Sequence, residues 1–198
     1  MARGLLIRTL AMGIALALLS QGAEAHTGAG IAGGFWSGVL HPITGWDHVI
    51  AMVAVGLWGA FLGRPAIWVL PVVFPLVMAF GGALGVLGVP LPHVETGIAL
   101  SAVVLGLMVA TAARLPLVWA AAIVGIFAIF HGHAHGTELP GAANPFAYAL
   151  GFVVATGCLH VLGIAFGTLT KWKEGQIAVR TGGMAIAVTG LAFLTGWL

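Results

Sequence analysis

The stretch that decides the fold runs from residue 116 to residue 138 and reads PLVWAAAIVGIFAIFHGHAHGTE. Its first two thirds hold no charged side chain, whereas its end brings together His131, His133, His135 and Glu138. Apolar runs recur along almost the whole chain, and a run of roughly 17–25 residues is long enough to cross a bilayer as a helix. The pattern predicts an all-α, polytopic helical membrane protein.

The composition excludes a soluble domain. Of the 198 residues, 61% are hydrophobic and 6% are charged, and the mean hydropathy is +1.13. Soluble domains carry about 25% charged residues, which cover their water-facing surface. A transmembrane β-barrel is excluded as well, because its strands alternate apolar and polar residues instead of running solidly apolar.

Residues 1–25 are predicted to be a cleaved signal peptide. Arg3 and Arg8 form a basic start, residues 10–19 form a short apolar core, and residues 23–25 (AEA) fit the small-x-small cleavage pattern. An uncleaved first helix is the alternative. Cleavage would leave His26 as the first residue of a single transmembrane domain, residues 26–198.

Six transmembrane helices are expected after the signal peptide. The apolar runs place them at 43–62, 66–88, 92–113, 116–134, 144–170 and 175–197. The glycine-rich segment 28–40 is too short to span, and we expect it to lie in the membrane interface or to form a re-entrant segment.

The basic residues predict the orientation. They occur in alternate connections, at Arg64, Arg114, Lys171, Lys173 and Arg180. Cytoplasmic loops carry an excess of Lys and Arg, and a cleaved signal puts the mature N-terminus in the periplasm. Both signals predict a multi-pass protein of the bacterial inner membrane. The periplasmic ends of the helices then hold most remaining polar residues: His26, His41, Asp47, His48, His93, Glu95, His131, His133, His135 and Glu138.

The segment 131–138 is a candidate metal-binding site, because imidazole is the commonest metal ligand among side chains. On a continuous helix His131 and His135 are four residues apart and can share one ion, and Glu138 follows three residues later. On such a helix His133 points away from the face of His131 and His135, unless Gly132 and Gly136 break the helix. The alternative is a solvated loop whose histidines have no function.

A second candidate group is HPITGWDH at residues 41–48. If this segment is helical from Pro42, His41 and His48 lie on similar faces about two turns apart. Asp47 could bind an ion directly or orient an imidazole as a hydrogen-bond acceptor. The alternative is a capping histidine beside a hydrogen-bonded aspartate.

Two further positions have weaker signals. Glu95 follows Pro92 and His93 at a predicted helix start, where it could bind metal or could simply favour the positive end of the helix dipole. His160 lies inside a predicted span, toward its cytoplasmic half. An intramembrane histidine is a functional-site hypothesis, and a ring bonded to a carbonyl of a neighbouring helix is its alternative.

The ligand types restrict the metal. Cys158 is the only cysteine, so the chain forms no intramolecular disulfide and no thiolate site, and we expect Cys158 to be a small buried hydrophobe. Nitrogen and oxygen ligands without thiolates suit Zn(II), Ni(II), Co(II) or Cu(II). Pro71 and Pro75 remove backbone hydrogen bonds near mid-membrane, which is common in transporters and is also a packing device.

These motifs resemble those of the HupE/UreJ family of nickel, sometimes cobalt, permeases linked to hydrogenase and urease maturation. The resemblance rests on HPITGWDH at 41–48, HGHAHGTE at 131–138 and LHVLG at 159–163, and it covers essentially the whole mature chain. It implies that the nickel path is lined first by His41, Asp47, His48, Glu95, His135 and Glu138. His131, His133 and His160 come next, and His26 is supporting.

The expected function is therefore import of Ni(II), with Co(II) as the second candidate, and not catalysis. The transported ion and the lipid bilayer are the expected partners, with no prosthetic group and no nucleic acid, and a homo-oligomer is left open. The chain has no P-loop and so does not itself hydrolyse ATP. Facilitated diffusion and proton coupling both remain open. A membrane-embedded metal-dependent hydrolase is an alternative, although the chain has no His-Glu-x-x-His motif. A haem-binding electron carrier, with His48 and His135 as axial ligands, is another.

Overall fold

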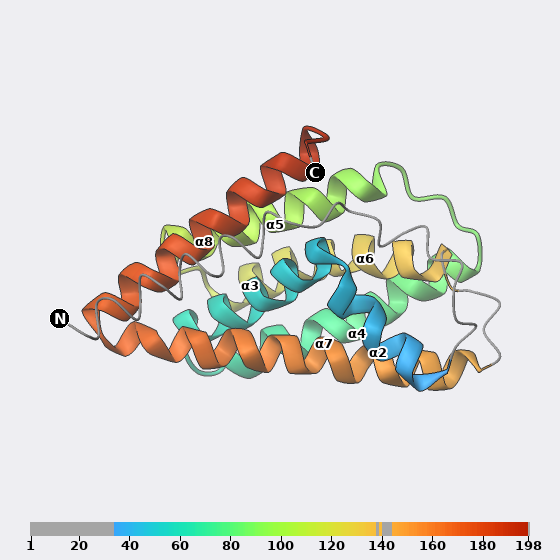
Figure 1. Cartoon of the computed structure of the whole chain (residues 1–198), viewed down its shortest axis with the longest axis horizontal. Coiled ribbons are helices and arrows are strands. Elements are labelled where there is room, and N and C mark those ends of the chain that lie inside the picture. Colours follow the sequence, from blue (N-terminus) through green and yellow to red (C-terminus); the bar gives the residue numbers. More distant parts are fainter. Residues whose placement is uncertain (1–33, 138, 140–143, 198) are drawn as a thin grey trace.

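A computed structural model describes residues 34–137, 139 and 144–197, and these residues form helices and no strand (Figure 1). In chain order the helices are α2 (Phe35–Thr44), α3 (Trp46–Leu62), α4 (Ala66–Val86), α5 (Val94–Ala110), α6 (Leu117–Thr137), α7 (Pro145–Gly167), the short 3-10 helix η1 (Thr168–Lys171) and α8 (Lys173–Leu194). The all-α prediction is confirmed for this part of the chain. The predicted signal peptide lies outside the described residues.

Four of the described helices are long and apolar enough to cross a membrane: α4, α6, α8, and α7 continued through η1. α2 and α3 together make a fifth if they count as one span, although their axes meet at 83°. α5 is apolar but has only 17 residues. The structure thus has a helix at each of the six expected places, while the length and composition of the described helices support four or five spans.

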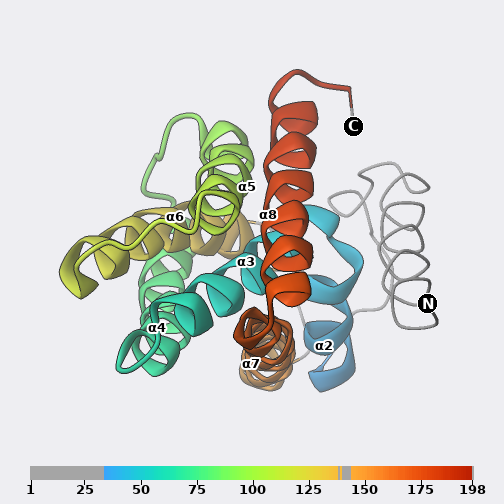
Figure 2. The same ribbon diagram turned by 90° about the vertical axis from the view of Figure 1, so that its left-hand side faces the viewer.

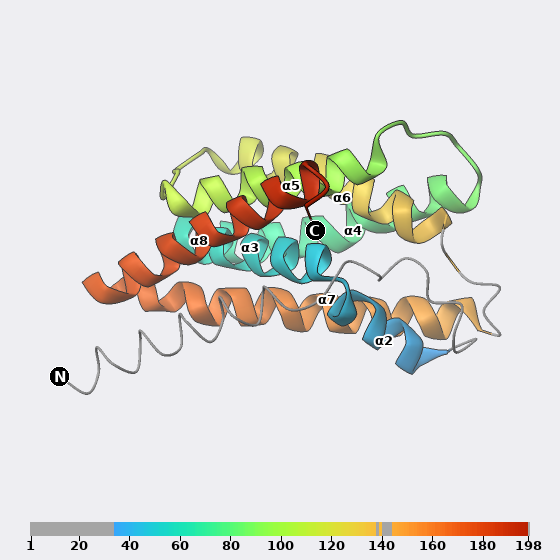
Figure 3. The same ribbon diagram turned by 45° about the horizontal axis from the view of Figure 1, so that its top comes forward.

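The predicted first span is wrong in one respect. The helix expected over residues 43–62 does not begin at residue 43, because the chain breaks at Gly45 into α2 and α3. Gly45 has an extended backbone, with φ −82° and ψ 106°, and its N–H still bonds the carbonyl of His41 at 3.3 Å. The segment that was expected to be interfacial or re-entrant therefore ends in a true helix, α2, which lies along the first half of α7 (Figure 3).

α4 shows how an apolar sequence serves both lipid and core. Every fourth residue from Ala66 to Met78 is buried, namely Ala66, Leu70, Phe74 and Met78. A second row of the same spacing is exposed, namely Trp68, Val72, Leu76 and Phe80. A helix that is apolar on all sides is typical of a membrane span, because the lipid-facing side must be apolar too.

Close helix pairs depend on glycine. A side chain at Gly132 or Gly136 of α6 would collide with the backbone carbonyls of Met78 and Gly82 on α4. α3 and α7 approach equally closely, since a side chain at Gly56 would collide with the carbonyl of His160. Small residues at such contacts let helix backbones pack where no hydrophobic effect drives association.

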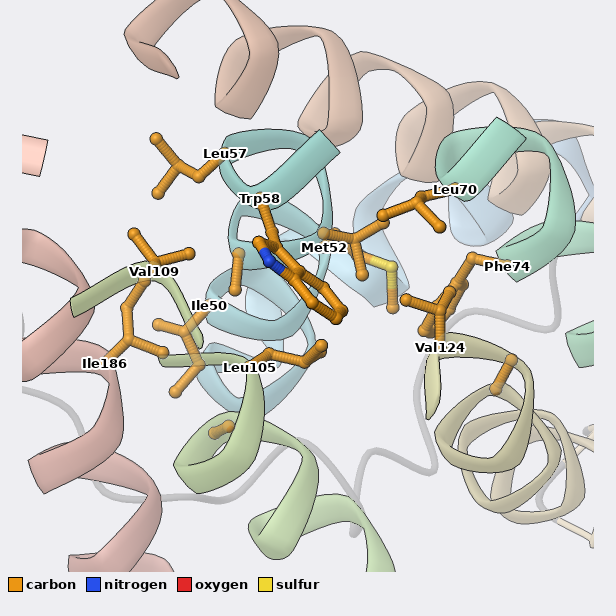
Figure 4. Packing of buried hydrophobic residues seen from close by; sticks show 14 of the residues in the cluster. Ile50, Met52, Leu57, Trp58, Leu70, Phe74, Leu105, Val109, Val124 and Ile186 are labelled. Carbon is orange, nitrogen blue, oxygen red and sulfur yellow. The ribbon is translucent and has the colours of Figure 1, made fainter. Parts of the chain in front are cut away.

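α3 lies at the centre of the bundle, with α4, α5, α7 and α8 around it (Figure 2). Its Met52 and Trp58 are fully buried in the main apolar cluster, together with Phe74 and Leu105 (Figure 4). The Trp58 Nε1–H donates to the carbonyl of Ala113 at 3.0 Å, just beyond the end of α5. The core therefore includes a polar contact that holds α5 against α3.

The connections between helices separate into two ends. Those from α3 to α4, from α5 to α6 and from α7 to α8 lie at one end, on the left of Figure 1, and the connection from α4 to α5 lies at the other. Arg64, Arg114, Lys171 and Lys173 belong to the first set, which we call the basic end. The second is called the histidine end, because α6 reaches it with His131, His133 and His135.

Candidate metal site

Three fully or nearly fully buried imidazole rings meet at the start of α3 and the end of α6. The centroid of the His48 ring lies 4.3 Å from that of His135 and 5.1 Å from that of His131. The ring of His41, at the end of α2, lies 4.9 Å from that of His135 and 6.4 Å from that of His48. We call these four residues the histidine cluster.

The break at Gly45 builds one side of the cluster. His41 lies in the last turn of α2 and His48 in the first turn of α3, so the 83° bend between these helices brings both rings to α6. The sequence predicted that they share a site, but the reason it gave, a continuous helix from Pro42, is wrong. A sharp break, and not the helical repeat, makes the two rings neighbours.

The helical repeat does build the other side. α6 continues unbroken through Thr137, so His131 and His135 lie one turn apart on the face that meets His48. Gly132 and Gly136 do not interrupt the helix, and both lie at its contact with α4. The prediction of a shared face for His131 and His135 is confirmed.

His133 lies away from the cluster, as a continuous helix requires. Its Nε2–H donates to the carbonyl of Val89, in the connection between α4 and α5, at 2.7 Å. A carbonyl oxygen can only accept, so this bond fixes the tautomer of the ring. The arrangement gives His133 a structural role, tying α6 to that connection.

Hydrogen bonds orient two of the cluster rings. The His48 Nδ1 lies 2.9 Å from Asp47 Oδ1, and the His131 Nδ1–H donates to the carbonyl of Phe127 at 2.9 Å. A carboxylate or carbonyl bound to one ring nitrogen is the usual partner of an imidazole that binds metal through the other. Asp47 thus lies where it orients His48, which is one of the two roles expected of it.

The buried nitrogens of the cluster are only partly satisfied. Among the residues that the structure describes, His131 Nε2 and both ring nitrogens of His135 have no hydrogen-bond partner. Leaving buried polar atoms unpaired costs about 1–3 kcal/mol each. His131 Nε2 and, in either tautomer, one nitrogen of His135 carry a lone pair that a metal ion can accept.

The rings are packed against one another edge to face. In the described part of the chain, no three His, Cys, Asp or Glu side chains are arranged to hold a metal ion. The ring planes of His48 and His131 meet at 79°, and those of His41 and His135 at 77°. Coordination of one ion by several of these rings requires them to turn from this edge-to-face packing.

α7 places two aromatic side chains beside the histidine cluster, and these were not predicted from the sequence. The Phe152 ring lies 4.4 Å from that of His135 and 6.1 Å from that of His41, and Tyr148 lies 6.0 Å from His41. Tyr148, Phe152, Thr156 and His160 are all buried and recur every four residues. That spacing was the available signal, because it places all four along one side of a helix.

His160 is fully buried in α7, and a phenyl ring connects it to the cluster. The Phe74 ring centroid lies 5.5 Å from that of His160 and 5.5 Å from that of His131. The His160 nitrogens have no partner within the described residues. The alternative of a ring bonded to a neighbouring carbonyl is thus not what the structure shows.

The remaining candidates lie elsewhere. Glu95 and His93 are exposed at the start of α5. Glu138 and His26 lie outside the described residues. Cys158 was expected to be buried, which is wrong: it is exposed on the outer side of α7, near the exposed Val161.

Known proteins resemble the chain over nearly its whole length. The sequence model of the HupE / UreJ protein family matches residues 14–193. Protein HupE of Rhizobium leguminosarum bv. viciae is 48% identical over 182 residues, which cover 91% of this chain and 95% of that protein. No solved structure matches the chain. By both sequence comparisons, the chain belongs to the HupE/UreJ family.

Proposed function

We propose that the chain is a permease that carries Ni(II), with Co(II) as the second candidate, across the bacterial inner membrane. The observation that carries this proposal is the run of buried imidazole rings inside a bundle of apolar helices. Ionisable residues within membrane spans are rare and mark ion pathways. Membership of a family known for nickel and cobalt permeases supports the same function.

The ligand chemistry fits a borderline dication. The cluster offers imidazole nitrogens, and Asp47 contributes a negative charge beside His48. Nickel, cobalt and zinc all accept such ligands, whereas soft Cu(I) prefers sulfur. Asp47 would lower the cost of moving a dication into the apolar layer, and Glu95, Glu138 and His26 are proposed to assist ion capture at the histidine end.

The direction follows from the basic end. Lys and Arg are retained on the cytoplasmic side of inner-membrane proteins, so the histidine end would face the periplasm. Ions would then meet the cluster first and pass inward along α7 to the cytoplasm, where they would be used for metalloenzyme maturation. A signal peptide at residues 1–25 would place the mature N-terminus on the periplasmic side.

No observation favours the alternatives. A metal-dependent hydrolase would use a general base such as the glutamate of a His-Glu-x-x-His motif, which the chain lacks. Haem ligation needs two imidazoles on opposite faces of a porphyrin ring, whereas the His48 and His135 rings are 4.3 Å apart and touch each other. Passage of an ion between neighbouring rings needs neither arrangement.

Uptake of radiolabelled nickel by intact cells tests the proposal. Cells making the wild-type protein should accumulate nickel above cells that lack it, and His48→Ala should abolish the difference. Glu174→Gln is the matched control, because Glu174 is an exposed acid at the basic end. The extent to which excess unlabelled nickel, cobalt or zinc lowers the uptake of labelled nickel then ranks the three ions by preference. Equal accumulation with and without the wild-type protein would refute the permease.

A further inference from the structure

The Phe74 side chain separates the histidine cluster from His160. Phe74 is fully buried in α4, beside Leu70 and Val124 (Figure 4). Its ring meets that of His131 at 67° and that of His160 at 77°, each with centroids 5.5 Å apart. One apolar ring therefore lies between two imidazoles that come from different helices.

Depth along the helices separates His131 from the other two rings. At about 1.5 Å per residue, His131 lies about 9 Å from the end of α6 at the histidine end. Phe152 of α7 contacts His135 near that same end, and His160 lies two further turns along α7, about 12 Å deeper. His131 is therefore the outermost of the three rings, and Phe74 and His160 lie deeper in the bundle.

A second polar site lies on the far side of the ring. Thr156 and His160 are one turn apart on α7, and both are at most 1% exposed. Thr156 Oγ1 and both nitrogens of His160 have no hydrogen-bond partner in the part of the chain that the structure describes. Three unpaired polar atoms at one buried place point to a ligand, because burying polar atoms without a bonding partner is unfavourable. We call Thr156 and His160 the deep pair.

We propose that the deep pair is a second ion-binding station and that the Phe74 ring is the barrier between it and the histidine cluster. This proposal rests on the permease function, since it assigns two stations and one barrier to the same path. A phenyl ring packed in the core offers no ligand to a hydrated ion and leaves no room for one. The ring must therefore turn aside before an ion passes from His131 to His160.

The backbone around Phe74 favours such movement. Pro71 and Pro75 both lie inside α4, on either side of Phe74. Each proline lacks the N–H that would bond the carbonyl four residues earlier. The turn that carries Phe74 is therefore held by fewer backbone hydrogen bonds than an ordinary helical turn, and its side chain is easier to displace.

Thiol labelling tests the barrier without any metal ion. The background is Cys158→Ala, which removes the chain's only cysteine, and His160→Cys then places a reporter thiol beyond Phe74. A charged, membrane-impermeant methanethiosulfonate reagent is applied from the histidine end, with oriented vesicles. We expect slow labelling with Phe74 intact, because the ring turns aside only at intervals, and rapid labelling after Phe74→Ala. Labelling should stay slow after Phe74→Leu, which keeps an apolar side chain of similar length. Equal labelling rates with Phe74 intact and after Phe74→Ala would overturn the barrier.

A nickel measurement tests the deep pair. His160→Ala should lower nickel uptake by cells about tenfold and should leave nickel retained by the purified protein at the histidine cluster. Unchanged uptake would refute the second station. Loss of both uptake and binding would show that His160 belongs to the same binding site as the histidine cluster, which would also refute it. Failure of the permease itself is seen separately, as absence of uptake by the wild type, whereas the thiol result is read with no metal present.

Discussion

The rings of His48 and His135 lie 4.3 Å apart, centroid to centroid, at the meeting of the first turn of α3 and the last turn of α6. Two features bring them together. The bend at Gly45 directs α3 toward α6, and glycine contacts hold α6 tightly against α4. The cluster thus results from helix packing, and single substitutions can change its contacts separately.

Asp47→Asn tests the orientation of His48. The substitution keeps the size of the side chain and removes the charge beside His48 Nδ1. Loss of such an outer partner weakens metal binding by about tenfold to a hundredfold. Equilibrium dialysis of the purified protein with nickel measures the effect. Glu174→Gln makes the same chemical change at the basic end and should bind like the wild type; a similar loss in both variants would contradict the role of Asp47.

His133→Ala and His135→Ala should separate structure from ion passage. His135→Ala removes a cluster ring and should abolish most nickel uptake while leaving the folded protein intact. His133→Ala breaks the bond to the Val89 carbonyl and should cost about 1–3 kcal/mol of stability. Thermal denaturation in detergent and nickel binding by the remaining folded protein measure the two effects. Loss of nickel binding in His133→Ala without loss of stability would contradict a structural role for His133.

Gly132→Ala should disrupt the contact between α4 and α6. A methyl group at residue 132 collides with the carbonyl of Met78, whereas at Gly125, also buried in α6, the nearest atom is a Val77 methyl at 3.8 Å. Gly125→Ala should be neutral or stabilising by up to about 1 kcal/mol, because alanine is the better helix former. Gly132→Ala should lower the melting temperature and the yield of folded protein. Equal melting temperatures for the two variants would show that the helices are not in close contact.

Trp58→Phe should loosen the end of α5. The change removes the N–H that the fully buried Trp58 donates to the partly buried Ala113 carbonyl at 3.0 Å. Loss of such a hydrogen bond costs about 0.5–1.5 kcal/mol. Trp68→Phe is the matched control, since Trp68 is exposed on the lipid-facing side of α4. Hydrogen exchange at the end of α5 should rise in Trp58→Phe alone, and equal exchange in both variants would contradict the contact.

Features that follow from a regular period could be predicted from the sequence. Apolar runs located the helices because a membrane requires long apolar segments. The shared face of His131 and His135, and the different direction of His133, followed from 3.6 residues per turn. The ends of α6 and α8 differ from the predicted ends by a few residues, since helix ends depend on neighbouring elements.

Features that depend on packing between distant segments could not be predicted. Gly45 gives no sign in the sequence that α2 and α3 meet at 83°. Phe74 is one phenylalanine among ten, and only the approach of α4 to α6 and α7 sets it between two histidines. Cys158 was expected to be buried from its apolar neighbours, but in a membrane such neighbours face lipid as readily as the core.

The most direct test of the account is nickel influx into proteoliposomes that contain only the purified protein, followed with a trapped dye that nickel quenches. Wild-type protein should admit nickel well above protein-free liposomes, Glu174→Gln should match the wild type, and His48→Ala should fall to the protein-free level. Influx by His48→Ala equal to that of the wild type would contradict a path through the histidine cluster.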